Sequence, residues 1–356
     1  MNHRGVVLIT GLNGYLASHA AQAFLAAGFR VRGTVRHISK ARQVQEILSG
    51  LGYGNRLEIE EVKDITKPGA FDTAIRGCQA VVHMASLIVA DLYGMKATDV
   101  MKVNVQGTTS ILQSALDFAG PQLQSVVFLS VVTTIAPPPP HIEKRLYTET
   151  DWDTISEGQV EQLANELDAL TSYRVGKIAA ERAFWRFRDE FKPRFSMTAL
   201  HPSFVMGPPL VLPAHPDDMK FSASLVWKIF SGQDIPPPLA SKLVGQHDPW
   251  VDVRDLARTA VFMVEHWQAT DAQRFICSSA VAVPQAIADI LRKRYPERSG
   301  VIKVGNPGEG YNGSFSNIRG ETGFDGSKVT LITRRKWIPF DQSVIDTAEA
   351  FQKYYA

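Results

Sequence analysis

The sequence predicts an α/β fold built on a doubly wound parallel sheet. In the first half of the chain, short runs of β-branched residues alternate with segments of helical periodicity. A glycine-rich turn follows the first of these runs and opens the first helical segment. Strands that alternate with helices in this way form right-handed crossovers, so they lie parallel and the helices cover both faces of the sheet.

Each expected element rests on a local pattern. The candidate strands are apolar runs bounded by glycine, asparagine or polar residues, namely Val6–Thr10, Arg30–Val35, Leu57–Val62, Ala80–Met84 and Val126–Leu129. The candidate helices carry apolar residues at steps of three and four and span residues 16–27, Asp99–Phe118 and Ser172–Phe191. Gly28 follows the first of them, where a helix end favours a left-handed residue.

Beyond residue 200 the chain becomes rich in proline. We expect His201–Asp218 and Gln233–Ala240 to be loops, because proline cannot continue the interior of a sheet. Phe221–Phe230 reads as an apolar helix that needs a packing partner. The sequence therefore predicts a nucleotide-binding domain over residues 1–200, whose sheet is completed by parts of 245–280, and a smaller substrate-binding lobe over 201–356.

The composition is typical of a soluble globular protein. The chain has 356 residues, 45% of them hydrophobic, and a net charge of +2, so we expect neither nucleic acid nor a membrane surface as a partner. Cys78 and Cys277 lack metal-ligand spacing, so neither a disulfide nor a metal site is expected. With no signal peptide and no apolar run of about 18 residues, we expect a cytoplasmic protein, either a monomer or a homodimer.

The glycine-rich turn ITGLNGYLASH has the features of a phosphate-binding loop. Gly11, Gly14 and Ala17 recur at steps of three, which lets backbone N–H groups and the helix N-terminus approach a pyrophosphate. The spacing differs from GxGxxG, but a turn between a strand and a helix is the context that supports such a site. We predict a Rossmann-type dinucleotide site, and a glycine-rich turn with no ligand is the alternative. Its predicted cofactor-binding residues are Gly11, Asn13, Gly14, Tyr15 and Leu16.

The end of the second strand favours NADP(H) over NAD(H). An NAD enzyme places a carboxylate there to bind the ribose 2′-OH, about 20 residues after the loop. No acidic residue occurs between Phe29 and Gln45, where the chain carries Arg36 and Lys40 instead. These cations suit a 2′-phosphate, because a guanidinium binds phosphate through paired hydrogen bonds. The alternative is that both belong to the solvated start of a helix.

Tyr173 and Lys177 in the stretch TSYRVGK form a candidate catalytic pair. Residues four apart on a helix share one face, but this spacing alone also fits an ordinary surface pair. When a carbonyl accepts a hydride, negative charge grows on its oxygen and needs a proton donor near pH 7. We expect the ammonium of Lys177 to lower the phenol pKa from its usual value of about 10.

Seven motifs, taken in chain order, resemble those of the extended short-chain dehydrogenase/reductase family. They are TGLNGYLA at 10–17, KDIT at 63–66, HMAS at 83–86, NVQGT at 104–108, YRVGK at 173–177, HPSFVMGP at 201–208 and WVDVRDLA at 250–257. The resemblance covers roughly residues 5–275. Within the family, the chain looks most like the dihydroflavonol-reductase and yeast carbonyl or methylglyoxal reductase branch. With these motifs in register, we expect Tyr173 and Lys177 to be catalytic.

The resemblance implies roles for further residues. Lys177 would also hold the nicotinamide ribose, with Asn104 in a proton relay behind it. Other cofactor contacts would come from Asp64 and Ile65 near the adenine, Ala85 and Ser86 near the nicotinamide ribose, and Pro202 and Val205 along the nicotinamide.

One position departs from the family pattern. The family usually has two adjacent hydroxyl residues after the fifth strand, the second of which helps to bind the substrate carbonyl. Here Ser130 takes the first position and Val131, which cannot donate a hydrogen bond, takes the second. Side chains two apart on an extended segment share a face, so Thr133 is our candidate replacement. Ser130 is either a further part of the site or a hydroxyl satisfied in the core.

These observations predict an NADPH-dependent reduction of a ketone or aldehyde to an alcohol. Phe204, Met206, Leu210, Leu212 and Trp227 suggest a bulky, apolar small-molecule substrate, although such residues also serve as packing. An epimerase or a 3β-hydroxysteroid-type dehydrogenase on the same scaffold is one alternative. A non-catalytic NADP-binding sensor is another.

Overall fold

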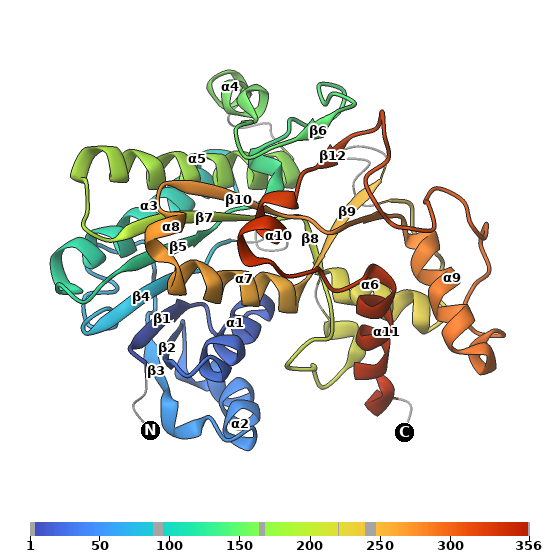
Figure 1. The fold of residues 1–356 in the computed structure, drawn as a ribbon, viewed down its shortest axis with the longest axis horizontal. Helices are drawn as coiled ribbons and strands as arrows, with labels where there is room; N and C mark the ends of the chain where they lie inside the picture. The colour runs from blue at the N-terminus through green and yellow to red at the C-terminus, as the bar shows by residue number, and fades with distance from the viewer. Residues whose placement is uncertain (1–3, 88–94, 164–167, 220, 239–246, 355–356) are drawn as a thin grey trace. The chain divides into compact units, whose positions relative to one another are not determined.

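The computed structural model describes residues 4–87, 95–163, 168–219, 221–238 and 247–354 (Figure 1). The chain forms two compact units. The first comprises Met1–Thr134, Trp152–His201 and Ala257–Phe275, and the second comprises Ile135–Asp151, Pro202–Leu256 and Ile276–Ala356. In this division residues 135–151, which lie within the predicted first domain, group with the second unit, and Ala257–Phe275 group with the first.

The first unit contains a seven-stranded sheet of order β10-β7-β5-β4-β1-β2-β3. Its strands are β1 (Val6–Thr10), β2 (Arg30–Val35), β3 (Leu57–Glu61), β4 (Cys78–His83), β5 (Ser125–Leu129), β7 (Ser196–Pro202) and β10 (Gln273–Cys277). The pairs from β3 through β2, β1, β4 and β5 to β7 are parallel. The direction of winding reverses between the neighbours β1 and β4. In an open α/β sheet, ligands bind outside the carboxyl ends of the strands at this point.

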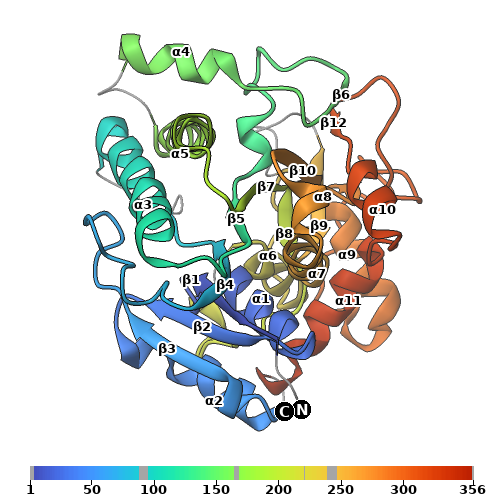
Figure 2. The same cartoon turned by 60° about the vertical axis from the view of Figure 1, so that its left-hand side comes forward.

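Helices cover both faces of this sheet, with α3 and α5 on one side of the strands and α1 and α2 on the other (Figure 2). These helices are α1 (Tyr15–Ala26), α2 (Arg42–Gly50), α3 (Ala97–Phe118) and α5 (Ala169–Phe191). Buried side chains of α3 and α5, such as Ile111 and Phe184, pack with strand residues such as Val81 and Val126 in one core cluster. The unit also holds α4 (Thr154–Leu163) and α8 (Trp267–Thr270).

The predicted α/β fold with its parallel sheet is confirmed. The structure contains all five expected strands, with ends shifted by two residues at most, and Gly28 after α1 has the left-handed φ of +91°. The proline-rich stretch His201–Asp218 is not all loop, which corrects the expectation. Pro202 is the last residue of β7, and β8 (Phe204–Met206) pairs in parallel with β9 (Asp248–Asp252). Proline is tolerated there because it stands at the end of a strand.

The second unit has a core of its own. Its sheets have the orders β11-β9-β8 and β12-β6, where β11 is Ala280–Ala282, β12 is Gly323–Phe324 and β6 is Leu146–Tyr147. Its helices are α6 (Phe221–Phe230), α9 (Pro284–Arg294), α10 (Ser327–Thr333) and α11 (Phe340–Ala350), while α7 (Val253–Glu265) runs from this unit into the first. The apolar helix α6 finds its partners here, because Val226 and Ile229 are buried with residues of α9 and α11. Residues 233–238 have no regular structure, and the rest of the predicted loop, 239–240, lies outside the described residues.

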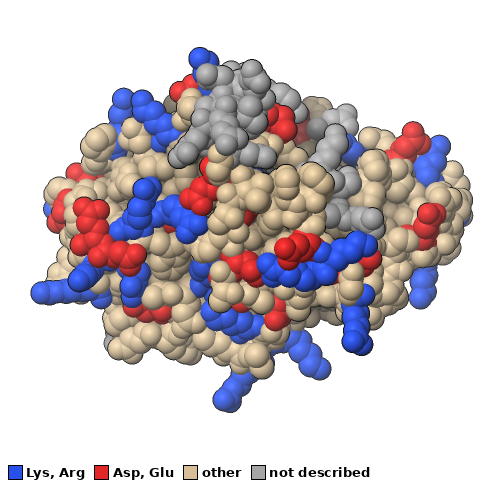
Figure 3. All heavy atoms as spheres, turned by 90° about the horizontal axis from the view of Figure 1, so that it is seen from above, with Lys and Arg blue, Asp and Glu red and all other residues tan. Residues whose placement is uncertain are grey.

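Charges of both signs are interspersed over the face drawn in Figure 3. Within the described part of the chain, every helix is too short or too polar to cross a bilayer.

Candidate active site

The loop between β1 and α1 is shaped to receive an anion. Gly11 has a φ of +74°, and a Cβ added there would lie 3.4 Å from Cβ of Ala85. Gly14 precedes α1 as its N-cap, with no side chain to cap the helix, and the first turn carries no acidic residue. The N–H groups of a helix start are unpaired donors with partial positive charge, so they suit phosphate oxygens. The turn thus offers both the space and the donors that a dinucleotide pyrophosphate needs.

A buried hydrogen-bond junction fixes this loop to the end of β4. Oγ1 of Thr10 accepts the backbone N–H groups of Met84 and Ala85, each at 2.9 Å, and lies 3.0 Å from Nδ1 of His83. Burial, together with the ammonium of Lys177, lowers the pKa of His83 to about 3, so the imidazole is neutral at pH 7. Since Thr10 Oγ1 already accepts two donors, its own proton is available to Nδ1. The junction holds Ala85 beside Gly11, where the two strand ends meet.

Arg36 and Lys40 follow β2 and are both exposed. Neither side chain makes a hydrogen bond or an ion pair with another described residue, so both are available to a ligand. Asp64 lies near this position: hydrogen bonds from Thr66 and then the charges of nearby cations, Arg36 among them, lower the pKa of its carboxyl group. The acid is therefore ionised at neutral pH, and its oxygen Oδ1 is already engaged by Thr66.

The helix α5 carries both members of the predicted catalytic pair. Asp168 caps it by accepting the N–H groups of Leu170 and Thr171, as the Ncap position of a helix favours. Tyr173 is half-buried, and its hydroxyl has no hydrogen-bond partner among the described residues. Lys177 is buried and donates from Nζ to the carbonyl oxygen of Leu129 at 2.8 Å.

The expected direction of the Tyr173 pKa shift was wrong. Burial raises the pKa of Tyr173 to about 12, because a phenolate is costly in a low-dielectric surrounding. Lys177 does not offset this effect, since its ammonium is directed to the end of β5, where it lies 5.3 Å from the ring centre of Phe128. Burial also lowers the pKa of Lys177 to about 8, against the opposing charge of Glu181. Tyr173 is thus a neutral phenol at pH 7 and keeps its proton.

A small pocket in the first unit brings several predicted residues together. Its lining includes Ile65, Ala85, Ser86, Asn104 and Lys177, but not Tyr173. Oδ1 of Asn104 accepts the hydroxyl of Ser86 at 2.8 Å, and Nδ2 donates to the carbonyl oxygen of Val100 at 2.9 Å. A Cβ at Gly176 would lie only 3.0 Å from Nδ2 of Asn104, so glycine permits this close approach of α3 and α5.

The three hydroxyl residues that follow β5 have different surroundings. Ser130 donates to Oε2 of Glu181 at 2.6 Å, and Thr134 donates to the same oxygen at 2.8 Å. Thr133 is also buried, but its hydroxyl has no hydrogen-bond partner among the described residues. The chain is not extended here, which corrects the argument used to select Thr133, because residues 132–134 form a turn of 3₁₀ helix.

Two other predictions concern the second unit. Pro202 and Val205 belong to it, whereas the other predicted site residues belong to the first. The aromatic and aliphatic residues taken as a hint of a bulky substrate are mainly packing: Met206 and Trp227 are buried in the core cluster of the second unit, with Phe204 and Leu212 packed against it. These four residues thus serve the packing of the second unit.

Sequence reasoning missed a set of buried charges beside the predicted pair. Glu181 is completely buried, and Arg174 forms a buried ion pair with Asp153 at 3.1 Å. One signal was available, since Glu181 stands four residues after Lys177 and thus continues the face of α5 that begins at Tyr173. An acidic residue on a long amphipathic helix is usually solvated, which hides this signal.

Comparisons with known proteins show which family and which relatives the chain resembles. A model of the NAD dependent epimerase/dehydratase family matches residues 7–277. Ketoreductase azaE of Aspergillus niger is 34% identical over 304 residues, which cover 82% of each chain. The NADPH-dependent methylglyoxal reductase GRE2 of Saccharomyces cerevisiae is 27% identical and covers 98% of each chain.

Solved structures extend the likeness to the fold. The crystal structure of yeast methylglyoxal/isovaleraldehyde reductase Gre2 with NADPH superposes with a TM-score of 0.81 at 26% identity, over 98% of this chain and 99% of that one. Gre2 of Candida albicans with NADPH gives 0.80, also at 26% identity, over 99% of this chain and all of that one. The family model matches well over half of the chain, and the glycine loop, the Tyr173 helix and the parallel sheet lie within its span. The chain therefore belongs to the NAD dependent epimerase/dehydratase family.

Proposed function

We propose that this protein is an NADP(H)-dependent oxidoreductase that reduces a ketone or an aldehyde to an alcohol, with Tyr173 as the proton donor. The observation that carries the proposal is the arrangement on α5. A neutral phenol stands one turn before a buried ammonium, and this ammonium is bonded to the end of β5. The turn that follows carries the Thr133 hydroxyl, for which the described part of the chain offers no hydrogen-bond partner. A donor that keeps its proton at pH 7 suits the reductive direction, in which an oxyanion forms and is protonated.

The cofactor assignment rests on the loop and on the two exposed cations. Residues 11–16 would bind the pyrophosphate through backbone N–H groups, with Ala85 and Ser86 near the nicotinamide ribose. Arg36 and Lys40 would bind a 2′-phosphate, since neither is engaged by another described residue. The reductases named above, which are described with NADPH, support this choice over NAD(H).

NADPH, when bound, supplies the hydride for the carbonyl carbon. The protein would contribute the remaining steps. Thr133 would donate a hydrogen bond to the carbonyl oxygen and orient it, and Tyr173 would transfer its phenolic proton to that oxygen. Lys177, whose Nζ is bonded to the end of β5, would hold the nicotinamide ribose, and Asn104, which holds Ser86, would lie on the path by which a proton returns to the Tyr173 phenolate.

A kinetic assay of NADPH oxidation tests the proposal. The wild-type protein is offered a panel of aldehydes and ketones of increasing size, and Tyr173→Phe is measured beside it. We expect turnover by the wild type and a loss of at least about a hundredfold in kcat for the variant, with NADPH binding retained. No turnover of any carbonyl despite NADPH binding would favour a sensor, and an exchange of substrate stereochemistry without net NADPH oxidation would favour an epimerase.

A further inference from the structure

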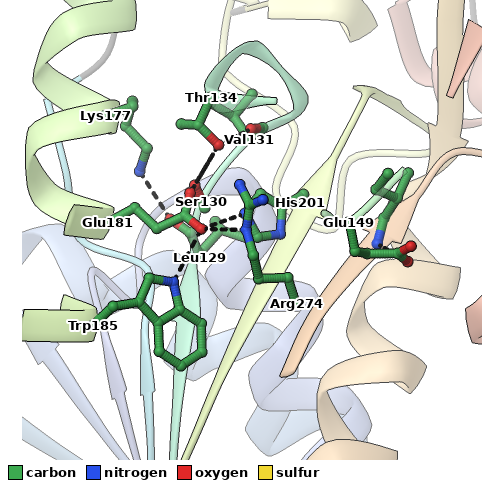
Figure 4. A network of polar contacts seen from close by, with 11 residues as sticks. Leu129, Ser130, Val131, Thr134, Glu149, Lys177, Glu181, Trp185, His201 and Arg274 are labelled. Carbon is green, nitrogen blue, oxygen red and sulfur yellow. Dashed lines mark hydrogen bonds and ion pairs between the residues drawn. The ribbon is translucent and has the colours of Figure 1, made fainter. Parts of the chain in front are cut away.

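The carboxylate of Glu181 is the centre of a buried hydrogen-bond network within the first unit (Figure 4). Its oxygen Oε2 accepts the hydroxyls of Ser130 and Thr134, at 2.6 and 2.8 Å. Its oxygen Oε1 is 2.8 Å from Nε of Arg274, 2.8 Å from Nε2 of His201 and 3.2 Å from Nε1 of Trp185. The two oxygens thus face different partners, the turn after β5 on one side and the sheet and helix on the other.

The Oε1 side keeps Glu181 charged and fixed. Burial alone would favour the protonated acid, but His201, Arg274 and the hydrogen bonds hold the pKa of the carboxyl group below its usual range. Arg274 is itself held in place, since its guanidinium lies 4.0 Å from the ring centre of Trp152. The carboxylate is therefore a rigid anchor at neutral pH.

The Oε2 side fastens the turn that carries Thr133. Ser130 and Thr134 flank this residue and both donate to Glu181, so a single carboxylate oxygen holds the two ends of the segment. The backbone is held as well, because Arg174 donates to the carbonyl oxygen of Thr133 at 2.9 Å. Both Glu181 and Arg174 belong to α5, the helix of Tyr173 and Lys177.

The hydroxyl groups of the turn connect this arrangement with the reaction. Of the three hydroxyls in residues 130–134, two are bound by Glu181 and one, that of Thr133, has no partner among the described residues. We propose that Glu181 is a positioning residue for carbonyl reduction: it fastens the turn to α5 and so keeps the free hydroxyl of Thr133 in register with Tyr173. This inference rests on the proposed function.

Glu181 also contributes charge, which offers a second readout. Among the described residues, the charged and titratable groups that interact with Lys177 are Glu181 on its own helix and His83 on β4. Glu181 is the negative one and favours the protonated form of Lys177, whereas His83 is neutral at pH 7. Removal of the Glu181 charge would take away this effect, so the pKa of Lys177 would fall further.

The test compares substitutions that remove single donors from Glu181. Thr134→Val keeps the shape of the side chain and removes one donor on the turn side, Thr134→Ser restores it, and Trp185→Phe removes a donor that does not belong to the turn. We expect Thr134→Val to lower kcat by about tenfold to a hundredfold with the KM for NADPH unchanged, because displacement of a positioned group by about 1 Å has this effect. Thr134→Ser and Trp185→Phe should stay within about twofold of the wild type.

Backbone amide hydrogen exchange over residues 130–136 provides a readout that needs no turnover. It should rise in Thr134→Val and in Glu181→Gln, and stay unchanged in Trp185→Phe. Glu181→Gln should also move the alkaline limb of the kcat profile to lower pH, which a purely structural role would not do.

Unchanged amide exchange in both Thr134→Val and Glu181→Gln would overturn the inference. Faster exchange in Thr134→Val together with a full kcat would overturn it as well. If the wild type reduces no carbonyl while exchange rises as expected, the proposed function fails and the fastening of the turn by Glu181 stands. The two failures are therefore distinguishable.

Discussion

The substitution Thr133→Val should change stability and activity in opposite directions. The Thr133 side chain is 4% exposed, and its hydroxyl oxygen is buried without a hydrogen-bond partner among the described residues. A buried hydroxyl that makes no hydrogen bond costs about 1–3 kcal/mol of stability. Valine has nearly the same shape and no such group, so the free energy of unfolding should rise by about 1 kcal/mol or more. In a chain of 356 residues this corresponds to roughly 1–4 °C in Tm.

The same substitution should lower kcat/KM for the carbonyl substrate. Loss of one donor to a developing oxyanion typically costs about 10²–10³ in rate, or about 2.7–4 kcal/mol of transition-state stabilisation. The KM for NADPH should stay unchanged, because Thr133 has no assigned role in cofactor binding. Thr133→Ser, which keeps the hydroxyl, should recover most of the rate.

Thr134→Val is the matched control for stability. Its hydroxyl is hydrogen-bonded to Glu181, so this variant should lose about 1 kcal/mol rather than gain it. Thermal unfolding and steady-state kinetics on the same preparations measure both effects. If Thr133→Val retains full kcat/KM, Thr133 is not the carbonyl donor, and if Ser130→Ala abolishes turnover instead, the hydroxyl was assigned to the wrong residue. If Thr133→Val is less stable than the wild type, the Thr133 hydroxyl has a hydrogen-bond partner in the wild type.

Three further predictions concern other parts of the first unit. Arg36→Glu should raise the Kd for NADPH at least tenfold and leave that for NADH nearly unchanged, as measured by fluorescence titration; an unmoved preference would refute the 2′-phosphate assignment. The pKa of His83 is about 3 in the fold and 6.5 in the unfolded chain. Its contribution to the free energy of unfolding should therefore be complete above pH 6.5 and should fall as the pH drops towards 3. By pH 5 the loss should be about 2 kcal/mol, and His83→Gln should flatten this part of the urea-unfolding profile. Arg174→Met should destabilise the protein by about 3–5 kcal/mol, because it leaves the buried charge of Asp153 without its partner; a change below about 1 kcal/mol in denaturant unfolding would contradict that pairing.

The strands of the first unit could be predicted from the sequence more completely than those of the second unit. Runs such as Val6–Thr10 and Arg30–Val35 are β-branched and bounded by turn residues, so local preference and tertiary structure agree there. β8 was missed because its three residues lie in a proline-rich stretch and are strand only through their pairing with β9. Pairing between segments distant in sequence leaves no local pattern to read.

The site shows the same limit. The glycines of the phosphate loop and the spacing of Tyr173 and Lys177 are visible in the sequence, because one turn of helix fixes which side chains share a face. The direction of the Tyr173 pKa shift was not predictable, since burial sets it and burial depends on the whole fold. Glu181 escaped notice for the same reason: its partners come from β7, β10 and the turn after β5, which meet only in three dimensions.

A crystal structure of the complex with NADPH tests the central claim most directly. We expect the Tyr173 hydroxyl to face the nicotinamide ring, Lys177 to contact the adjoining ribose, and the Thr133 hydroxyl to point into the same space, close enough to Tyr173 for both hydroxyls to reach one carbonyl oxygen. If the Tyr173 hydroxyl is turned away from the ring or shielded from it by protein, the phenol is not the proton donor and the reductase mechanism is wrong.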